Sequence, residues 1–189
     1  ELDNVVYGAS GFVGRLLSEY LALHAPPGTR IGLAGRSEAK LAAVRDGLPE
    51  VARDWPLLVA DANDAEALNR LARSATAVAT TVGPYAKYGM GMVAACAANG
   101  THYADLTGEV VFVRRCADEF DAEARRTGAR IVNSCGLDSI PSDLGVHETY
   151  LTARGLGAGG LGNTRLVVTG MRGGFSGGTI DSMRNQMAE

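Results

Sequence analysis

Short apolar runs alternate along the chain with longer segments in which apolar residues recur every three or four positions. The first run, residues 4–7, ends at Gly8, and residues 12–23 follow with apolar side chains at helical spacing. A short apolar run predicts a buried strand, and the three-to-four spacing predicts an amphipathic helix. The chain therefore opens as a strand, a glycine turn and a helix.

The same alternation continues through the next 130 or so residues of the chain. We expect further strands at residues 30–34, 56–60, 75–82, 101–104 and 130–133, and further helices after Ser37 and at 64–72, 89–98, 111–127 and 139–150. Strands that alternate with helices imply right-handed crossovers and a parallel sheet covered on both faces. The predicted fold class is α/β, with a Rossmann-type doubly wound parallel sheet.

The pattern changes near residue 154. Residues 155–178 are crowded with glycine around one plausible strand, 164–169, and a short helix is expected after Thr179. Because a lone strand is not stable, this strand either extends the first sheet or begins a second domain, and we favour the second. We expect a dinucleotide-binding domain at residues 1–150, then a linker and the start of a truncated second α/β domain at 151–189.

A glycine-rich turn between the first strand and the first helix indicates a dinucleotide. Glycines permit a tight turn and a close approach of backbone N–H groups to a pyrophosphate, which then faces the N-terminus of the helix. Glycine turns without a ligand are common, but the setting in a βαβ pattern favours the cofactor. The cofactor-binding residues expected here are Gly8, Ser10, Gly11, Phe12, Val13 and Gly14.

The end of the second predicted strand indicates which dinucleotide binds. Sites for NAD usually hold the ribose with an Asp or Glu at this place. Here Gly35, Arg36 and Ser37 stand instead, and a guanidinium and a hydroxyl suit a 2′-phosphate. NADP is therefore favoured over NAD. The alternative is that Arg36 is a solvated strand-end residue and Ser37 only caps the next helix.

Two further strand ends complete the expected cofactor site. Asp61 is placed to meet the adenine edge, although it could equally cap the next helix. The fourth strand ends in Val82, Gly83, Pro84 and Tyr85, where the backbone is expected to run under the pyrophosphate and the nicotinamide ribose. A simple turn would use the same Gly-Pro pair.

Polar residues at the later strand ends are candidates for the substrate side of the crevice. They are Tyr103, Asp105, Thr107, Glu109, Asn133, Cys135, Asp138 and Ser139. Each has a structural alternative, such as a helix cap or a turn. If a proton must be delivered, Tyr85, Tyr103 and Glu109 are the candidate donors by their position. The chain lacks a Tyr-x-x-x-Lys pair, and its three histidines lack metal-ligand spacing, so we expect no metal.

The composition of the chain limits the kinds of partner that it is expected to bind. The net charge of −3 offers no electrostatic footprint for nucleic acid, so we expect a small-molecule substrate. Cys96, Cys116 and Cys135 are widely spaced, which suits a reducing compartment better than a disulfide framework. No apolar run approaches the length of a membrane span, and the cytoplasm is the expected location.

Several sequence blocks, taken in order, resemble those of saccharopine dehydrogenase-like NAD(P)-binding oxidoreductases, particularly the bacterial branch that includes trans-acting enoyl reductases of lipid biosynthesis. The blocks are residues 7–14, 34–36, 82–85 with 88–89, 101–109, 136–143 and 176–179. The resemblance runs essentially from end to end. It implies an NAD(P)-binding Rossmann domain and a second α/β domain that covers the nicotinamide and shapes the substrate site.

The function expected from this resemblance is hydride transfer between the nicotinamide and an enoyl, imine or carbonyl substrate. Members of the family are typically longer, so we expect the chain to be a fragment whose own activity is in doubt. A truncated covering domain should expose apolar surface, so we also expect self-association into a homo-oligomer. The alternative function is a non-catalytic NADP-binding sensor or scaffold, since no acid–base couple is recognisable.

Overall fold

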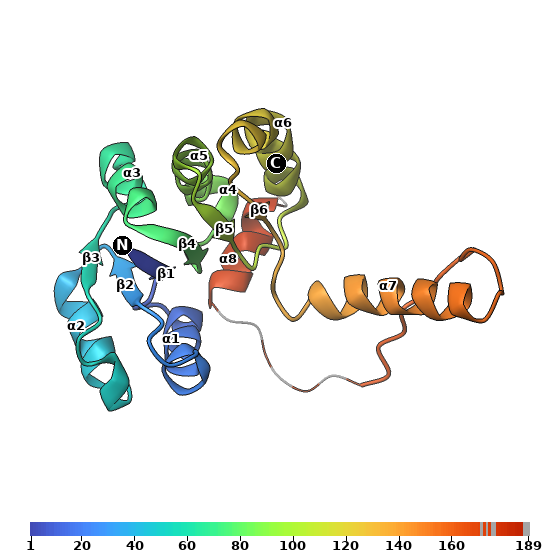
Figure 1. Ribbon diagram of the computed structural model, residues 1–189, viewed down its shortest axis with the longest axis horizontal. Helices are drawn as coiled ribbons and strands as arrows, with labels where there is room; N and C mark the ends of the chain where they lie inside the picture. Colours follow the sequence, from blue (N-terminus) through green and yellow to red (C-terminus); the bar gives the residue numbers. More distant parts are fainter. Residues whose placement is uncertain (171, 173, 175–176, 187–189) are drawn as a thin grey trace.

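The computed structural model describes residues 1–170, 172, 174 and 177–186, and its centre is one parallel sheet of six strands (Figure 1). The strand order is β3-β2-β1-β4-β5-β6, which confirms the predicted Rossmann-type fold. The order reverses between β1 and β4, where such sheets bind their ligands. The strands are β1 (Leu2–Tyr7), β2 (Ile31–Gly35), β3 (Leu57–Val59), β4 (Ala75–Thr80), β5 (His102–Ala104) and β6 (Ile131–Val132).

Helices pack on both faces of the sheet, but over different halves. In Figure 1, α1 and α2 lie on one side, and α3, α5 and α6 lie on the other. The short α4 was not predicted, because four residues are too few for a helical repeat to be visible. The helices are α1 (Phe12–His24), α2 (Glu38–Asp46), α3 (Ala65–Arg73), α4 (Tyr85–Tyr88), α5 (Met90–Asn99), α6 (Val110–Thr127), α7 (Ile140–Gly155) and α8 (Gly177–Gln186), with a 3-10 turn at Glu50–Ala52.

Strand β1 separates two apolar clusters, because successive side chains point to opposite faces of a sheet. Val5 and Tyr7 belong to the cluster beneath α3, α5 and α6, whereas Val6 belongs to the cluster beneath α1 and α2. Val5 and Val6 are fully buried. Burial of an aliphatic side chain contributes about 1.5–3 kcal/mol to the stability of the fold, so β1 stabilises the helical layers on both faces of the sheet.

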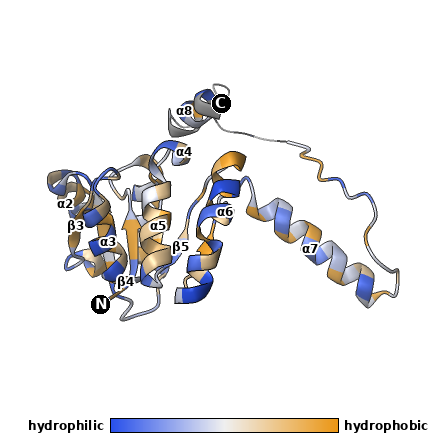
Figure 2. Ribbon diagram, turned by 90° about the horizontal axis from the view of Figure 1, so that it is seen from above, coloured by the Kyte–Doolittle hydropathy of each residue, from blue (hydrophilic) through white to orange (hydrophobic). Residues whose placement is uncertain are grey.

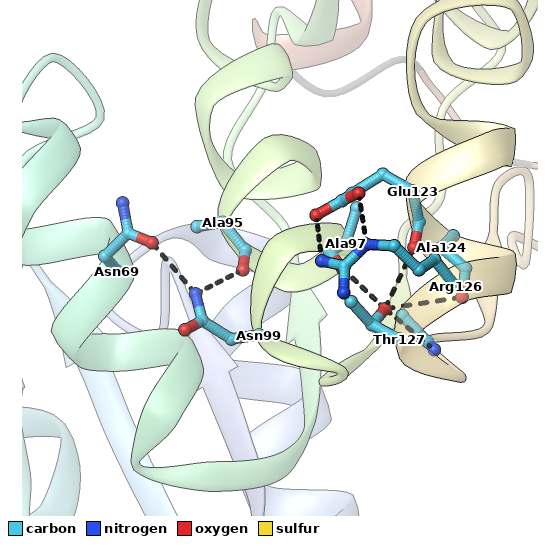
Figure 3. Close-up of polar contacts among 9 residues, drawn as sticks. Asn69, Ala95, Ala97, Asn99, Glu123, Ala124, Arg126 and Thr127 are labelled. Carbon is cyan, nitrogen blue, oxygen red and sulfur yellow. Dashed lines mark hydrogen bonds and ion pairs between the residues drawn. The ribbon is translucent and has the colours of Figure 1, made fainter.

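Polar side chains join α3, α5 and α6 near the amino ends of the strands (Figure 3). Asn99 at the end of α5 donates from Nδ2 to Asn69 Oδ1 of α3 at 2.8 Å and to the Ala95 carbonyl at 2.7 Å. The Thr127 hydroxyl at the end of α6 donates to the Ala97 carbonyl of α5 at 2.6 Å. These bonds fix the helical layer at the edge opposite to the crevice described below.

One half of one sheet face lacks a helical cover within the described residues. The register pairs Val6 of β1 with Ala79 of β4, Ala79 with Ala104 of β5, and Ala104 with Val132 of β6, so these four side chains point to the same face. Helix α1 covers this face at Val6 and leaves the part beyond it without a helix from the described residues. Val132 is 50% exposed. The neighbouring helix α1 also exposes an apolar stripe, made of Phe12, Leu16, Tyr20 and Leu23.

Helix α7 buries none of its residues and runs away from the sheet in both views (Figures 1 and 2). Beyond it, residues 156–170 form neither helix nor strand, so the strand predicted at 164–169 is wrong. Leu166, Val167 and Val168 have the composition of a strand, but they are exposed, and a strand needs a neighbour to pair with.

The helix expected after Thr179 is present as α8, which begins at Gly177. Part of the glycine-rich block before it, including Ser176, lies outside the described residues. None of the described helices combines the length and the apolar run that a lipid bilayer requires of a span.

Candidate functional site: a crevice at the switch point of the sheet

A crevice lies across the carboxyl ends of β1 to β4, at the point where the strand order reverses. It runs from the loop after β3, past the glycine turn after β1, to the loop after β4. Its lining residues are Tyr7, Gly8, Ser10, Gly11, Gly35, Arg36, Asp61, Ala62, Asn63, Thr81, Val82, Gly83 and Tyr88.

The turn after β1 requires glycine at two positions. Gly8 has a φ of +89°, and a Cβ there would lie 2.7 Å from Thr81 Oγ1 and 2.9 Å from Val82 Cγ2. A Cβ on Gly14 would overlap the Gly8 carbonyl oxygen and lie 2.8 Å from the Cα of Ala9. The two glycines therefore let α1 and the loop after β4 approach the turn more closely than larger residues would.

Helix α1 begins at the crevice without a side-chain cap. Its N-cap is Gly11, whose own N–H donates to the Gly8 carbonyl at 2.9 Å, and its first turn carries no acidic residue. The first N–H groups of a helix have no acceptor within the helix, so those of Phe12, Val13 and Gly14 are available to a ligand. The positive end of the helix dipole favours an anion at the same place.

Arg36 and Ser37, at the end of β2, have different surroundings. Arg36 is exposed, lines the crevice and makes no hydrogen bond or ion pair within the described chain. Ser37 does cap α2, since its hydroxyl accepts a bond from Lys40 N at 3.4 Å, and it is not among the lining residues.

Asp61 lines the crevice but does not cap the helix that follows it. Its Oδ1 accepts bonds from Asn63 N at 2.9 Å and from Asn63 Nδ2 at 3.0 Å, which closes a local turn. Asp64 caps α3 instead, with bonds from the N–H groups of Glu66 and Ala67 at 3.0 Å each. The helix-cap alternative for Asp61 is therefore wrong.

The loop after β4 forms the other end of the crevice. The Thr81 N–H donates to the Tyr7 carbonyl at 2.8 Å, which joins this loop to β1. Val82 and Gly83 line the crevice, while Pro84 and Tyr85 are buried behind them. Tyr88, on the last turn of α4, completes the wall, and Lys87 Nζ lies 5.0 Å from the centroid of its ring.

Three side chains expected as proton donors or acceptors are buried away from the crevice lining. The Tyr85 hydroxyl donates to the Thr80 carbonyl at 3.2 Å, and the Tyr103 hydroxyl donates to Asp105 Oδ2 at 2.9 Å. Burial raises the pKa of both phenols well above the usual value. Glu109 is 2% exposed, and its carboxylate accepts bonds from two backbone N–H groups.

The other strand-end candidates also lie outside the lining residues. Thr107 and Asn133 both bond to the buried Asp105, through Thr107 N at 3.0 Å and Asn133 Nδ2 at 2.7 Å. Cys135 and Asp138 are exposed, and Ser139 precedes α7 without a capping bond from its side chain. Among the described residues, no cluster of three or more His, Cys, Asp or Glu could hold a metal.

Five lining residues were not predicted from the sequence: Tyr7, Ala62, Asn63, Thr81 and Tyr88. The first four lie at a strand end or within four residues after one, so the strand assignment itself was the available signal. Tyr88 lies eight residues after β4, on the unpredicted helix α4, so the strand assignment gave no signal for it.

Known proteins resemble both the sequence and the structure of this chain. The family model described as the saccharopine dehydrogenase NADP-binding domain matches residues 5–132. A Mycobacterium tuberculosis protein provisionally named a trans-acting enoyl reductase is 55% identical over 183 residues, which are 97% of this chain and 43% of that protein. The trans-acting enoyl reductase of Mycobacterium ulcerans is 52% identical over 168 residues, 89% of this chain and 40% of the relative.

Two solved structures share the fold. Saccharopine dehydrogenase (L-Glu forming) from Saccharomyces cerevisiae aligns with a TM-score of 0.68 at 20% identity, over 83% of this chain and 32% of that one. Triphenylmethane reductase from Citrobacter, complexed with NADP(H), aligns with a TM-score of 0.52 at 18% identity, over 70% of this chain and 48% of that one. The chain spans less than half the length of the relatives it matches.

Proposed function

Because the chain belongs to the saccharopine dehydrogenase NADP-binding domain family, we propose that it is the cofactor-binding part of an NADP-dependent oxidoreductase that reduces an enoyl substrate. One observation carries the proposal. A single crevice joins the exposed Arg36, the uncapped start of α1 and the loop after β4 in the order that an extended dinucleotide requires.

In this arrangement the chain binds the cofactor from one end to the other. Arg36 pairs with the 2′-phosphate, because a guanidinium presents two parallel N–H donors to phosphate oxygens. The N–H groups of Phe12 and Val13 hold the diphosphate at the start of α1. Thr81, Val82 and Gly83 lie along the nicotinamide half. When bound, the nicotinamide supplies or accepts hydride at C4.

We propose Tyr88 for the proton that reduction of a double bond also requires. It is the residue with an ionisable side chain that lines the crevice beyond the loop after β4. The residues named for this role from the sequence, Tyr85, Tyr103 and Glu109, have their polar atoms bonded within the protein. A general acid must reach the reacting atom, which favours Tyr88 over the three.

The names of the relatives support the enoyl substrate. Proteins that match 89–97% of this chain are named trans-acting enoyl reductases, which favours an enoyl group over an imine and an enzyme over a non-catalytic sensor. We place the cofactor domain at residues 1–150 and assign residues 151–189 to a linker and the start of a second domain. The second domain would then cover the nicotinamide.

Turnover tests this proposal. NADPH consumption is followed by absorbance in the presence of α,β-unsaturated acyl thioesters of increasing chain length, with imines and saturated thioesters as controls. We expect the protein that contains this domain to oxidise NADPH with the unsaturated thioesters alone. NADPH binding without turnover of any substrate would favour the sensor, and the absence of NADPH binding would exclude both functions.

A further inference from the structure

Two carboxylates are buried in the loop that follows β5. Asp105 and Glu109 are only 3% and 2% exposed, and neither forms an ion pair within the described chain. A buried charge is costly unless hydrogen bonds satisfy it. The groups that donate hydrogen bonds to the two carboxylates therefore show which parts of the chain each carboxylate holds in place.

The Glu109 carboxylate lies at the start of α4, which precedes it by more than 20 residues in the sequence. Its Oε1 accepts a bond from Tyr85 N at 2.9 Å, and its Oε2 accepts one from Ala86 N at 2.7 Å. These are the first two N–H groups of α4, and the helix itself offers them no acceptor. The Ser182 hydroxyl of α8 donates to Oε1 at 2.8 Å.

Glu109 is itself fixed by the loop that carries it. Its N–H donates to Thr107 Oγ1 at 3.0 Å, and Thr107 N donates to Asp105 Oδ1 at 3.0 Å. Asp105 also accepts bonds from Asn133 Nδ2 at 2.7 Å and Ser134 N at 2.8 Å, after β6. The loops that follow β4, β5 and β6 are thus bonded to one another in series.

Helix α4 carries one wall of the crevice. Tyr88 on its last turn lines the crevice together with Val82 and Gly83, which precede the helix. The Tyr85 ring, at the first position of α4, packs against Phe112 of α6, with ring centroids 5.7 Å apart. Glu109 and Phe112 therefore set where α4 lies, and α4 sets where Tyr88 lies.

We propose that Glu109 is a positioning residue for the nicotinamide half of the crevice: its carboxylate fixes the start of α4, and with it Val82, Gly83 and Tyr88. The Ser182 hydroxyl joins α8 to the same carboxylate and adds to its effect. This inference rests on the proposed function, since it assumes that NADP occupies the crevice.

The chemistry of the contact requires a carboxylate. Three donors converge on Glu109, and an ionised carboxylate offers two acceptor oxygens and no hydrogen. In a glutamine the amide NH₂ would face one of the two N–H groups of α4, so one bond would be replaced by repulsion. Hydrogen bonds to an ionised group are also about twice as strong as neutral ones.

The experiment compares two ligands by titration calorimetry. NADPH fills the whole crevice, whereas adenosine 2′,5′-bisphosphate reaches only the adenosine half beside Arg36. We expect Glu109→Gln to weaken the binding of NADPH about tenfold and to leave the affinity for adenosine 2′,5′-bisphosphate unchanged, because the lost bonds lie beyond the diphosphate. The matched control Glu119→Gln, an exposed carboxylate of α6 paired with Arg115, should change neither affinity.

Ser182→Ala removes the third donor and leaves both α4 bonds intact. We expect a loss of about threefold in NADPH affinity and none in adenosine 2′,5′-bisphosphate affinity. If Glu109→Gln weakens both ligands equally, or neither, the positioning role is wrong. If the unmodified chain binds neither ligand, the proposed function itself fails, which is a different outcome.

Hydrogen exchange of the unmodified chain tests the inference even if Glu109→Gln does not fold. The N–H groups of Tyr85 and Ala86 should exchange slowly, because the buried carboxylate accepts both. Those of Phe12 and Val13, at the uncapped start of α1, should exchange fast without cofactor. Equal and fast exchange at both helix starts would overturn the inference.

Discussion

The two halves of the crevice edge use their polar groups in opposite ways. At the ends of β1 and β2, the first N–H groups of α1 and the Arg36 guanidinium have no partner within the described chain. At the end of β5, Asp105 and Glu109 are buried, and donors from neighbouring loops meet them. In the first half the donors are not used by the described chain, whereas in the second half the chain supplies donors to its own carboxylates and so fixes the wall of the crevice.

This difference shows that the end of a strand does not by itself make a polar residue a ligand contact. The same edge of the sheet supplies Arg36, which is exposed, and Tyr103, which is buried with its hydroxyl on Asp105. What separates them is whether the chain itself supplies a buried partner for the polar atom. Three variants test the contrast between an open half and a satisfied half, and a fourth lies away from the crevice.

The largest effect is expected at the glycine turn of the open half. In Gly14→Ala the new Cβ would overlap the Gly8 carbonyl, and backbone cannot move aside as a side chain can. We expect a loss of about 3 kcal/mol or more in the free energy of unfolding, together with loss of NADPH binding. Urea denaturation and calorimetry measure the two.

Gly145→Ala in α7 is the matched control, because a Cβ there meets nothing within 4 Å. Its effect should be neutral or slightly stabilising, since alanine is the better helix former. Equal stabilities of the two variants would show that the turn has room for a side chain.

The next largest effect is expected in the satisfied half. Asp105→Asn places an amide NH₂ among the donors from Tyr103, Thr107, Asn133 and Ser134. We expect the free energy of unfolding to fall by about 2–3 kcal/mol, because buried donors lose their acceptor. Asp118→Asn, an exposed member of an ion pair with Arg114, should stay within about 0.5 kcal/mol of the parent in the same urea titration.

A smaller, ligand-specific effect is expected at Arg36. Arg36→Ala should weaken the binding of NADPH by about tenfold to a hundredfold, which equals roughly 1.4–2.7 kcal/mol, and leave the affinity for NADH unchanged. Arg53→Ala removes a surface arginine whose partner is Glu50 and should change neither affinity. A parallel loss for both nucleotides would show that Arg36 does not read the 2′-phosphate.

The smallest effect is expected at the amino end of β1, away from the crevice. Arg30 donates to the Asp3 carboxylate from its side chain and its backbone, which lowers the pKa of Asp3 from 3.8 to about 2. Since the folded-state pKa is the lower one, the contribution to stability is full above about pH 4 and is lost as the pH falls toward 2.

The difference in urea midpoint between the parent and Asp3→Asn should therefore be small at neutral pH and shrink as the pH falls toward 2. A difference that grows on acidification would contradict the assigned direction of the pKa shift.

Periodicity predicted the six strands and the helices between them, because burial on one or both faces fixes the spacing of apolar residues. The glycine string predicted a cofactor at the first turn, and the structure requires glycine there, because a Cβ on Gly8 or Gly14 would clash with neighbouring atoms. Periodicity could not show that Glu109 turns inward, because its partners at residues 85, 86 and 182 are distant in sequence. Composition likewise predicted a strand at 164–169 that has no neighbour to pair with.

A titration of the unmodified chain with NADPH and with NADH tests most directly whether this edge of the sheet binds NADP. NADPH should bind at least about tenfold more tightly than NADH, since only NADPH carries the phosphate that Arg36 can pair with. Equal affinities, or no binding of either nucleotide, would contradict the account.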